Sequence, residues 1–272
     1  MHCEANARAV ILRIRDHIMS KQRHHKRDQR RNNSPNTLFG LHAVEAALFN
    51  PARNLHRLYA TRNAAEKLSE ALSRRNVIPE IVEPKVIDRL TGPDTVHQGV
   101  ILETDPLPAQ GLDILTGNAP VIVLDQITDP HNVGAILRSC AAFGAEALIM
   151  TARHSPALTG TLAKAASGGL EHVPVILVPN LARTLSELGR QGFLRVGLDG
   201  KAENRIEQLE TGGRLVLVLG AEGKGLRRLT RENCDQLCRI NTTGSIASLN
   251  VSNAAAVALH AVHLGRSSHE NS

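Results

Sequence analysis

The sequence is poor in aromatic residues: Trp is absent, and one Tyr and four Phe make up only 2% of its 272 residues. Hydrophobic residues still account for 42%, so Val, Leu, Ile and Ala must fill the interior. This composition favours an α/β protein with buried parallel strands over an aromatic-rich β-sandwich. No apolar run approaches the ~20 residues of a membrane span, and we expect a soluble protein.

Cysteine is also scarce. The four residues form no disulfide framework, and reduced cysteines are typical of the cytoplasm, where we expect the protein to act. Two of them are four residues apart and two histidines follow, so a metal site is conceivable. The intervening sequence fits a buried strand better, and we predict no metal. The four cysteines are Cys3, Cys140, Cys234 and Cys238, and the metal-site candidates are Cys234, Cys238, His260 and His263.

The basic excess of the chain lies in its first 33 residues. Nine Lys/Arg against three acidic residues there give +6, which equals the formal net charge of the whole chain. Residues 20–36 nearly lack large apolar side chains, which predicts disorder in isolation. We interpret residues 1–36 as a tail with a basic arm for RNA phosphates, with a solubilising tail as the alternative. Residues 9–19 could be an organelle-targeting segment, but we prefer a translation start at Met19.

A compact α/β pattern runs through residues 37–105 and predicts a small domain. Apolar residues at helical spacing predict helices over residues 41–49 and 64–75. Strands are expected over residues 55–60, 78–82 and 99–103. Residues 106–119 begin with Pro-Leu-Pro-Ala-Gln-Gly and are the expected linker.

Residues 120–266 alternate strand and helix patterns, and we expect a second domain there, followed by a short tail (267–272). Apolar strands with helices between them imply a doubly wound sheet, in which the ligand lies beyond the carboxyl ends of the strands. Strands are expected at 121–124, 147–150, 173–178, 194–198, 215–219 and 236–240, and helices at 133–143, 158–166, 181–190 and 251–264.

The first of three unusual loops, residues 125–138, follows a strand and opens a helix. Asp129 or Asn132 could cap that helix. Asn132 and Arg138 are six residues apart, so an ideal helix does not place them on one face. Both could still reach a site at the helix start if Asn132 lies in the loop. The alternative is an ordinary capped helix with a solvated arginine.

The second loop, LGAEGKGL at residues 219–226, follows the most apolar strand. Its glycines permit positive φ or close contact between the backbone and a ligand. The loop is no Walker A sequence, because Leu226 rather than Lys-Ser/Thr follows Gly225. It also lacks the Rossmann G-x-G-x-x-G spacing, so nicotinamide binding finds little support. A tight turn is the alternative.

The third loop, residues 241–253, is rich in Ser, Thr and Asn, yet lies between a buried strand and an Ala-rich helix. Buried hydroxyls and amides need hydrogen-bond partners. A polar ligand or a tightly folded backbone would supply them. The alternative is helix capping by Ser248 or Asn250.

In order and spacing, the three loops resemble the three signature motifs of the SpoU family within the SPOUT (SpoU/TrmH) methyltransferases. Residues 164–174, KAASGGLEHVP, are typical of the same family. Residues 39–46, FGLHAVEA, and 97–100, HQGV, are similar to the small L30e-like RNA-binding domain of the 23S rRNA guanosine-2′-O-methyltransferases and their mitochondrial relatives. The resemblance covers residues 37–265.

The resemblance implies a mostly parallel SPOUT-type sheet with helices on both faces and a C-terminal trefoil knot, preceded by an L30e-like α/β domain. It implies S-adenosyl-L-methionine as the cofactor, held largely by backbone groups at Gly220, Ile240 and Leu249. All five residue types of the family's catalytic set are present, which speaks for a working enzyme. The matching positions are Asn132, Arg138, Glu222, Ser248 and Asn250.

The position of Arg138 is often assigned as the catalytic base of this family. A guanidinium holds its proton far above neutral pH, which makes that role physically awkward. We therefore expect Arg138 to bind the adjacent phosphate and to stabilise the developing alkoxide. Glu222, Ser248 and Asn250 would orient the ribose or the loop.

The family also implies a homodimer with the knot at the interface. The small residues of the helix expected over 251–264 suit such close packing, although a helix–sheet contact within the chain is the alternative. With so few aromatic residues to stack on bases, RNA recognition should depend on shape, 2′-hydroxyl and phosphate contacts.

The function expected from the resemblance is S-adenosylmethionine-dependent 2′-O-methylation of a guanosine in 23S rRNA. The L30e-like domain favours rRNA, because the tRNA guanosine enzymes of this family typically lack it. The alternatives are a tRNA guanosine 2′-O-methyltransferase and a non-catalytic RNA-binding ribosome assembly factor.

Overall fold

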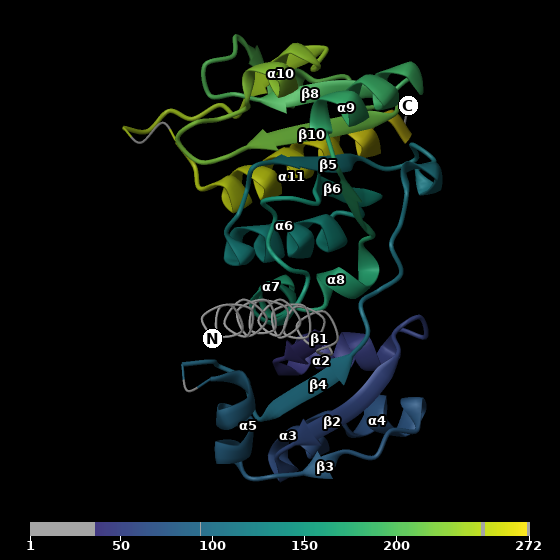
Figure 1. The fold of residues 1–272 in the computed structure, drawn as a ribbon. Helices are drawn as coiled ribbons and strands as arrows, with labels where there is room; N and C mark the ends of the chain where they lie inside the picture. Colours follow the sequence, from purple (N-terminus) through teal and green to yellow (C-terminus); the bar gives the residue numbers. More distant parts are fainter. Residues whose placement is uncertain (1–35, 93, 246–247, 271–272) are drawn as a thin grey trace, which may run out of the picture. The chain divides into compact units, whose positions relative to one another are not determined.

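The computed structural model describes residues 36–92, 94–245 and 248–270, which contain two β-sheets (Figure 1). The chain divides into two units, residues 1–36 and 37–272. The basic tail expected in residues 1–36 lies outside the described residues, apart from Asn36. Within the described ranges, no helix is long and apolar enough to cross a membrane.

The first sheet has the strand order β1-β4-β2-β3, with β2 antiparallel to β4 and parallel to β3. Neighbouring residues of β4 face opposite sides, as the alternation of a strand requires. Leu102 joins the large core cluster, whereas Ile101 packs with Tyr59 and Ile87. The strands are β1 (Asn36–Phe39), β2 (Leu55–Ala60), β3 (Glu80–Ile81) and β4 (Val100–Thr104).

The helices of this region differ in part from the prediction. The prediction of a single helix over residues 64–75 was wrong. Two helices meet at Leu68, where the backbone leaves helical geometry (φ −96°, ψ 7°). Leu68 is buried in the core, and tertiary packing outweighs the helical pattern there. The expected strand over 78–82 is only two residues long, and β1 and α5 were not expected. The helices are α2 (Leu41–Phe49), α3 (Arg62–Lys67), α4 (Ser69–Arg75) and α5 (Pro84–Thr91).

The second sheet has the strand order β7-β6-β5-β10-β8-β11-β9, and all of its strand pairs are parallel. The predicted mostly parallel sheet is therefore confirmed. The strands are β5 (Val121–Asp125), β6 (Ala147–Thr151), β7 (Val175–Val178), β8 (Leu194–Leu198), β9 (Asn204–Arg205), β10 (Leu215–Gly220) and β11 (Gln236–Arg239).

Most of the remaining helices lie where the strand–helix alternation predicted them. The strand expected over 173–178 begins only at Val175, because Val173 is the C-cap of α8 and its N–H donates to the Gly169 carbonyl (3.0 Å). α8, α10 and β9 were not expected. The elements are η1 (Leu112–Ile114), α6 (Pro130–Ala142), α7 (Gly160–Ala166), α8 (Gly169–His172), α9 (Leu181–Arg190), η2 (Ile206–Gln208), α10 (Arg228–Glu232) and α11 (Val251–Glu270).

β5 shows why the parallel strands read as continuous apolar runs. All of its residues are buried. Ile122 and Leu124 belong to the core cluster that includes residues of α6 and α11, whereas Val121 and Val123 pack with residues of α9. Figure 1 shows α6 and α11 on one face of this sheet and α9 and α10 on the other.

α11 uses small residues for packing within the chain. Ala255, Ala258, Leu259 and Val262 are buried in the same core cluster as residues of α6. This face of α11 therefore packs within the chain, mainly against α6, whereas the alternative expected from the sequence was a helix–sheet contact.

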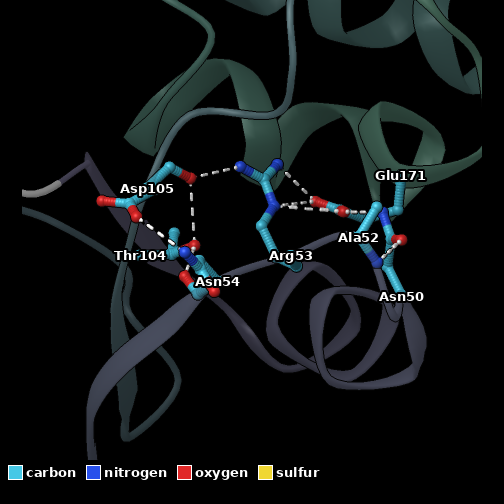
Figure 2. A network of polar contacts seen from close by, with 7 residues as sticks. All are labelled: Asn50, Ala52, Arg53, Asn54, Thr104, Asp105 and Glu171. Atoms are coloured by element: carbon cyan, nitrogen blue, oxygen red, sulfur yellow. Dashed lines mark hydrogen bonds and ion pairs between the residues drawn. The ribbon is translucent and has the colours of Figure 1, made fainter.

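A buried ion pair connects the loop before β2 with α8 (Figure 2). Arg53 Nη2 lies 2.7 Å from Glu171 Oε1, and both side chains are only 2% exposed. Asn50 Nδ2 donates to Glu171 Oε2 (2.7 Å), and Arg53 Nη1 donates to the Asp105 carbonyl (3.0 Å). The sequence showed Glu171 only as part of residues 164–174, which are typical of the family. The structure shows that its partners are Arg53 and Asn50.

Candidate functional site

A cavity of about 410 Å³ opens at the carboxyl ends of β8, β10 and β11. This edge of a parallel sheet is where α/β proteins bind ligands, and the volume is within the ~300–1,000 Å³ of small-molecule sites. One wall is the backbone of the loop after β10. The apolar walls are formed by Leu198, Leu219, Cys238, Ile240, Leu249 and Val251.

The loop after β10 folds back tightly on itself. A Cβ on Gly220 would lie 2.2 Å from the carbonyl carbon of Gly225, so no side chain fits there. Gly223 and Gly225 have φ of 75° and 65°, the left-handed region that favours glycine. Gly225 N donates to the Ala221 carbonyl (2.8 Å). The tight turn that the sequence left open is therefore present, and its backbone also lines the cavity.

Asn132, Glu222 and Asn250 bring the three loops together. Asn250 Nδ2 donates to Glu222 Oε1 (2.7 Å) and to Asn132 Oδ1 (3.0 Å). Asn132 Nδ2 lies 3.4 Å from the same Glu222 oxygen, and Val251 N donates to it at 3.2 Å. One carboxylate oxygen thus holds two amide side chains and one backbone N–H.

Two helices begin at this cluster. Asp129 Oδ1 accepts from His131 N (2.9 Å) and caps α6. Asn250 Oδ1 accepts from Ser252 N (2.9 Å), so the capping role left open for Asn250 exists beside its contact with Glu222. The partial positive charge at the start of α11 favours a carboxylate at this place.

The positions expected to hold a cofactor meet at one cavity. Gly220, Ile240 and Leu249 all line it, and so do Glu222 and Ser248. They come from the end of β10, the end of β11 and the segment before α11. Asn132 does not line the cavity but is joined to it through Glu222.

Arg138 is not brought to this cavity. Asn132 lies within α6 rather than in the loop before it, so the condition under which both side chains would reach one site is not met. Six residues correspond to about 9 Å along a helix and about 120° around it. Arg138 is exposed, and in the described part of the chain no carboxylate forms an ion pair with it.

Two ion pairs near the cavity were missed in the sequence. Asp125, fully buried at the end of β5, accepts from Arg227 N (3.0 Å) and Arg227 Nε (2.6 Å). This fixes the segment after the glycine turn to the neighbouring strand. Asp199 pairs with Arg231 at the cavity wall. An acid ending an apolar strand signals a need for a partner, but the identity of the partner depends on the fold.

The cysteines and histidines considered as metal ligands have other surroundings. His260 and His263 pack against Phe143, with ring centroids 5.7 and 6.2 Å away. Burial raises the pKa of Cys234 to about 11 and also raises the pKa of Cys238, which keeps both thiols protonated at neutral pH. Among the described residues, no group of three or more His, Cys, Asp or Glu could hold a metal ion.

The fold and the cavity define the class: a parallel α/β protein with a small-molecule cavity at the carboxyl edge of its sheet. The model of the SpoU rRNA Methylase family matches residues 119–260, and that of the RNA 2′-O ribose methyltransferase substrate-binding family matches residues 37–110. The chain belongs to the SpoU rRNA methylase family, as the resemblance predicted.

Relatives from two bacteria bear the same name, 23S rRNA (guanosine-2′-O-)-methyltransferase RlmB. The protein of Pseudomonas putida is 41% identical over 233 residues, which cover 82% of this chain and 93% of that protein. The protein of Escherichia coli strain K12 is 37% identical over 236 residues, which cover 82% of this chain and 95% of that protein.

Solved structures share the fold. The SpoU methyltransferase AviRb from Streptomyces viridochromogenes in complex with AdoMet aligns with a TM-score of 0.75 at 24% identity, over 89% of this chain and 94% of that chain. A TrmH-family protein from Porphyromonas gingivalis aligns with a TM-score of 0.70 at 23% identity, over 87% of this chain and 92% of that chain. At this identity the likeness establishes the fold alone.

Proposed function

We propose that the protein transfers a methyl group from S-adenosylmethionine to the ribose 2′-hydroxyl of a guanosine in large-subunit rRNA. The observation that carries the proposal is the junction of Asn132, Glu222 and Asn250 beside a small-molecule cavity in a chain of the SpoU family. The curated relatives, which the chain matches over more than nine-tenths of their length, bear the name of this reaction.

The cavity suits S-adenosylmethionine in size and chemistry. Its apolar walls accept an adenine face, and the loop backbone around Gly220 together with the segments of Ile240 and Leu249 offers N–H and C=O groups for its edge. S-adenosylmethionine supplies an electrophilic methyl group when bound. The chain must then exclude competing water, align the ribose oxygen and let one proton leave that oxygen.

Glu222, Asn132 and Asn250 perform the alignment in this proposal. The carboxylate holds both amides, so that their positions depend on one another. Ser248, at the cavity wall, contributes a hydroxyl toward the ribose. Positioning of this kind matters because a displacement of ~1 Å can cost about 10²-fold in rate.

Arg138 acts in this proposal at the cavity of a second copy of the chain. A homodimer, with a trefoil knot in each chain at the interface, would place the exposed Arg138 guanidinium near the partner's cluster. There it binds the phosphate beside the reacting ribose and stabilises the developing alkoxide, while the proton leaves to that phosphate or to water. A guanidinium is well suited to this role, because it can donate two parallel hydrogen bonds to one phosphate.

Mixing two inactive variants tests the dimer. Homodimers of Arg138→Ala and of Glu222→Ala should each be inactive. If Arg138 serves the partner's site, each mixed dimer contains one site in which both Arg138 and Glu222 are intact. A statistical mixture of the two variants should therefore recover about a quarter of the wild-type activity. No recovery above the homodimers, with mixed dimers present by native mass spectrometry, would contradict the exchange of Arg138 between subunits.

Residues 37–105 would bind the RNA substrate, residues 106–119 would link them to the methyltransferase domain (120–266), and the tail (1–36) would add non-specific phosphate contacts. Deletion of residues 1–33 should weaken RNA binding and flatten its salt dependence without moving the methylated nucleotide. A shifted nucleotide would contradict this division of roles.

Methyl transfer from labelled S-adenosylmethionine tests the function itself. Unmodified large-subunit rRNA should accept label and tRNA should not, and Asn132→Ala should abolish transfer. Asn204→Ala, which changes an exposed residue of the edge strand β9, should leave it intact. Label on tRNA alone would favour the tRNA alternative, and failure to bind S-adenosylmethionine by calorimetry would favour an assembly factor.

A further inference from the structure

A second cavity, of about 500 Å³, lies at the carboxyl ends of β5, β6 and β7. It opens at the same sheet edge as the cofactor cavity, on strands to the other side of β10. Arg227 and Arg228, which follow the glycine turn of the first cavity, form part of its wall. Its lining includes Gln126, Arg153, His154, Leu181, Arg227 and Arg228.

The walls of this cavity are strongly basic. Its lining residues, all in the described part of the chain, include three arginines and one histidine but no Asp or Glu. Arg227 is held by the buried Asp125. Arg228 pairs with Glu232 in an exposed i,i+4 contact, which is worth little. Arg153 is exposed and, among the described residues, forms no ion pair.

The start of α9 adds to this positive wall. The helix begins at Leu181, and Leu181 and Ala182 line the cavity. Asn180 Oδ1 accepts from Arg183 N (3.1 Å) and so satisfies one of the N–H groups that a helix leaves open at its start. The remaining N–H groups and the helix dipole favour an anion here.

Two residues of this cavity have a backbone conformation that is uncommon for residues other than glycine. Gln126 and His154 have φ of 60° and 66°, a region that residues other than glycine rarely adopt. Both line the cavity. Such strain persists where the surrounding structure enforces it, and it is frequent at binding sites.

We propose that this cavity binds a phosphate of the RNA backbone that flanks the methylated nucleotide. The inference rests on the proposed function, because it supposes an RNA substrate at the neighbouring cavity. The segment from the glycine turn to Arg227 borders both cavities, so one strand of RNA crossing this edge of the sheet meets both. Arg153 and Arg228 bind the phosphate, and the start of α9 supports it.

The variants Arg153→Ala and Arg228→Ala test the proposal, with Arg190→Ala as the matched control. Arg190 is an exposed arginine at the opposite end of α9. Each test variant should raise KM for an unmodified large-subunit rRNA transcript about tenfold with kcat and S-adenosylmethionine affinity unchanged. A plot of the logarithm of the RNA association constant against log [KCl] has a negative slope. Its magnitude should decrease by about 0.7–0.9 for each lost phosphate contact.

Several outcomes overturn the inference. Unchanged KM and salt slope in both variants, while the wild type methylates the transcript, would refute the phosphate site and leave the proposed function intact. A loss of inorganic phosphate binding by calorimetry with unchanged KM for RNA would assign the cavity to a free anion instead. Equal effects in Arg190→Ala would reveal a general loss of charge. A wild type that methylates no RNA would refute the proposed function itself.

Discussion

Asn250 Nδ2 donates a 2.7 Å hydrogen bond to Glu222 Oε1, and the same amide nitrogen donates to Asn132 Oδ1, 118 residues away in the chain. Asn132 lies in the first turn of α6 after β5, Glu222 in the loop after β10, and Asn250 just before α11, which follows β11. A site of this kind exists only when all three loops are folded. Loss of one side chain should therefore displace the other two.

Glu222→Ala should lower kcat by about 10²-fold or more, because the two amides lose the oxygen that holds them. It should also lower the free energy of unfolding by about 1 kcal/mol, since Val251 N loses its acceptor. Steady-state methyl transfer and urea denaturation measure the two effects. Glu210→Ala, an exposed acid outside the cluster, is the control. Wild-type kcat in Glu222→Ala would contradict the role of the carboxylate.

Gly220→Ala should weaken S-adenosylmethionine binding and destabilise the protein by about 1–3 kcal/mol, because the new methyl group collides with the backbone of Gly225. Gly200→Ala is a matched control: Gly200 also lines the cavity, but nothing lies within 4 Å of a Cβ there. Calorimetry and thermal denaturation should separate the two variants. Equal behaviour would mean that the turn has no part in binding.

Arg138→Lys should lose most methyl transfer while binding S-adenosylmethionine as the wild type does, since lysine keeps the charge but not the bidentate fork. The pH–rate profile should keep its shape, because the guanidinium is not the base in this account. Retention of most activity in the lysine variant would argue against bidentate positioning of a phosphate.

Arg53→Met should destabilise the protein by about 3–5 kcal/mol, because Glu171 would remain buried without its partner. The double variant Arg53→Met/Glu171→Leu should recover part of this loss. Arg228→Met, which breaks an exposed pair, should cost at most about 0.5 kcal/mol. Urea denaturation compares the three. A double variant less stable than Arg53→Met would show that the ion pair is not the cause.

Asp235 gives a prediction on pH. Its hydrogen bonds to Arg195 lower the pKa of the carboxyl group in the folded protein. The stabilisation is therefore complete above the unfolded pKa of about 3.9 and is lost as the pH falls through the lower folded pKa. Asp235→Asn should be less stable than the wild type at pH 7, and the difference should shrink below about pH 4. A difference that grows on acidification would contradict this sign.

The sheet was predictable because its strands are buried on both faces. Runs such as the one around Leu217 have no polar alternation, and their alternation with helical segments indicates a parallel sheet. The start of α6 was also readable, since Asp129 and Pro130 form an ordinary N-cap and first turn. Shorter amphipathic elements such as α5 carry too few residues for their periodicity to stand out.

The site was predictable only through family resemblance. No local pattern brings Glu222 to Asn132, since 90 residues separate them. The same holds for Asp125 and Arg227, 102 residues apart, and for Arg53 and Glu171. The course of α6 likewise decides where Arg138 points. These pairs form only when the chain folds. From the sequence one can infer only that a buried charged side chain needs a partner, not which residue it is.

Mapping 2′-O-methylation across rRNA and tRNA in a strain that lacks the gene shows which RNA the protein methylates. We predict that one guanosine of large-subunit rRNA loses its methyl group, and that the wild-type gene, but not the Glu222→Ala variant, restores it. An unchanged large-subunit rRNA, or a loss confined to tRNA, would contradict the account.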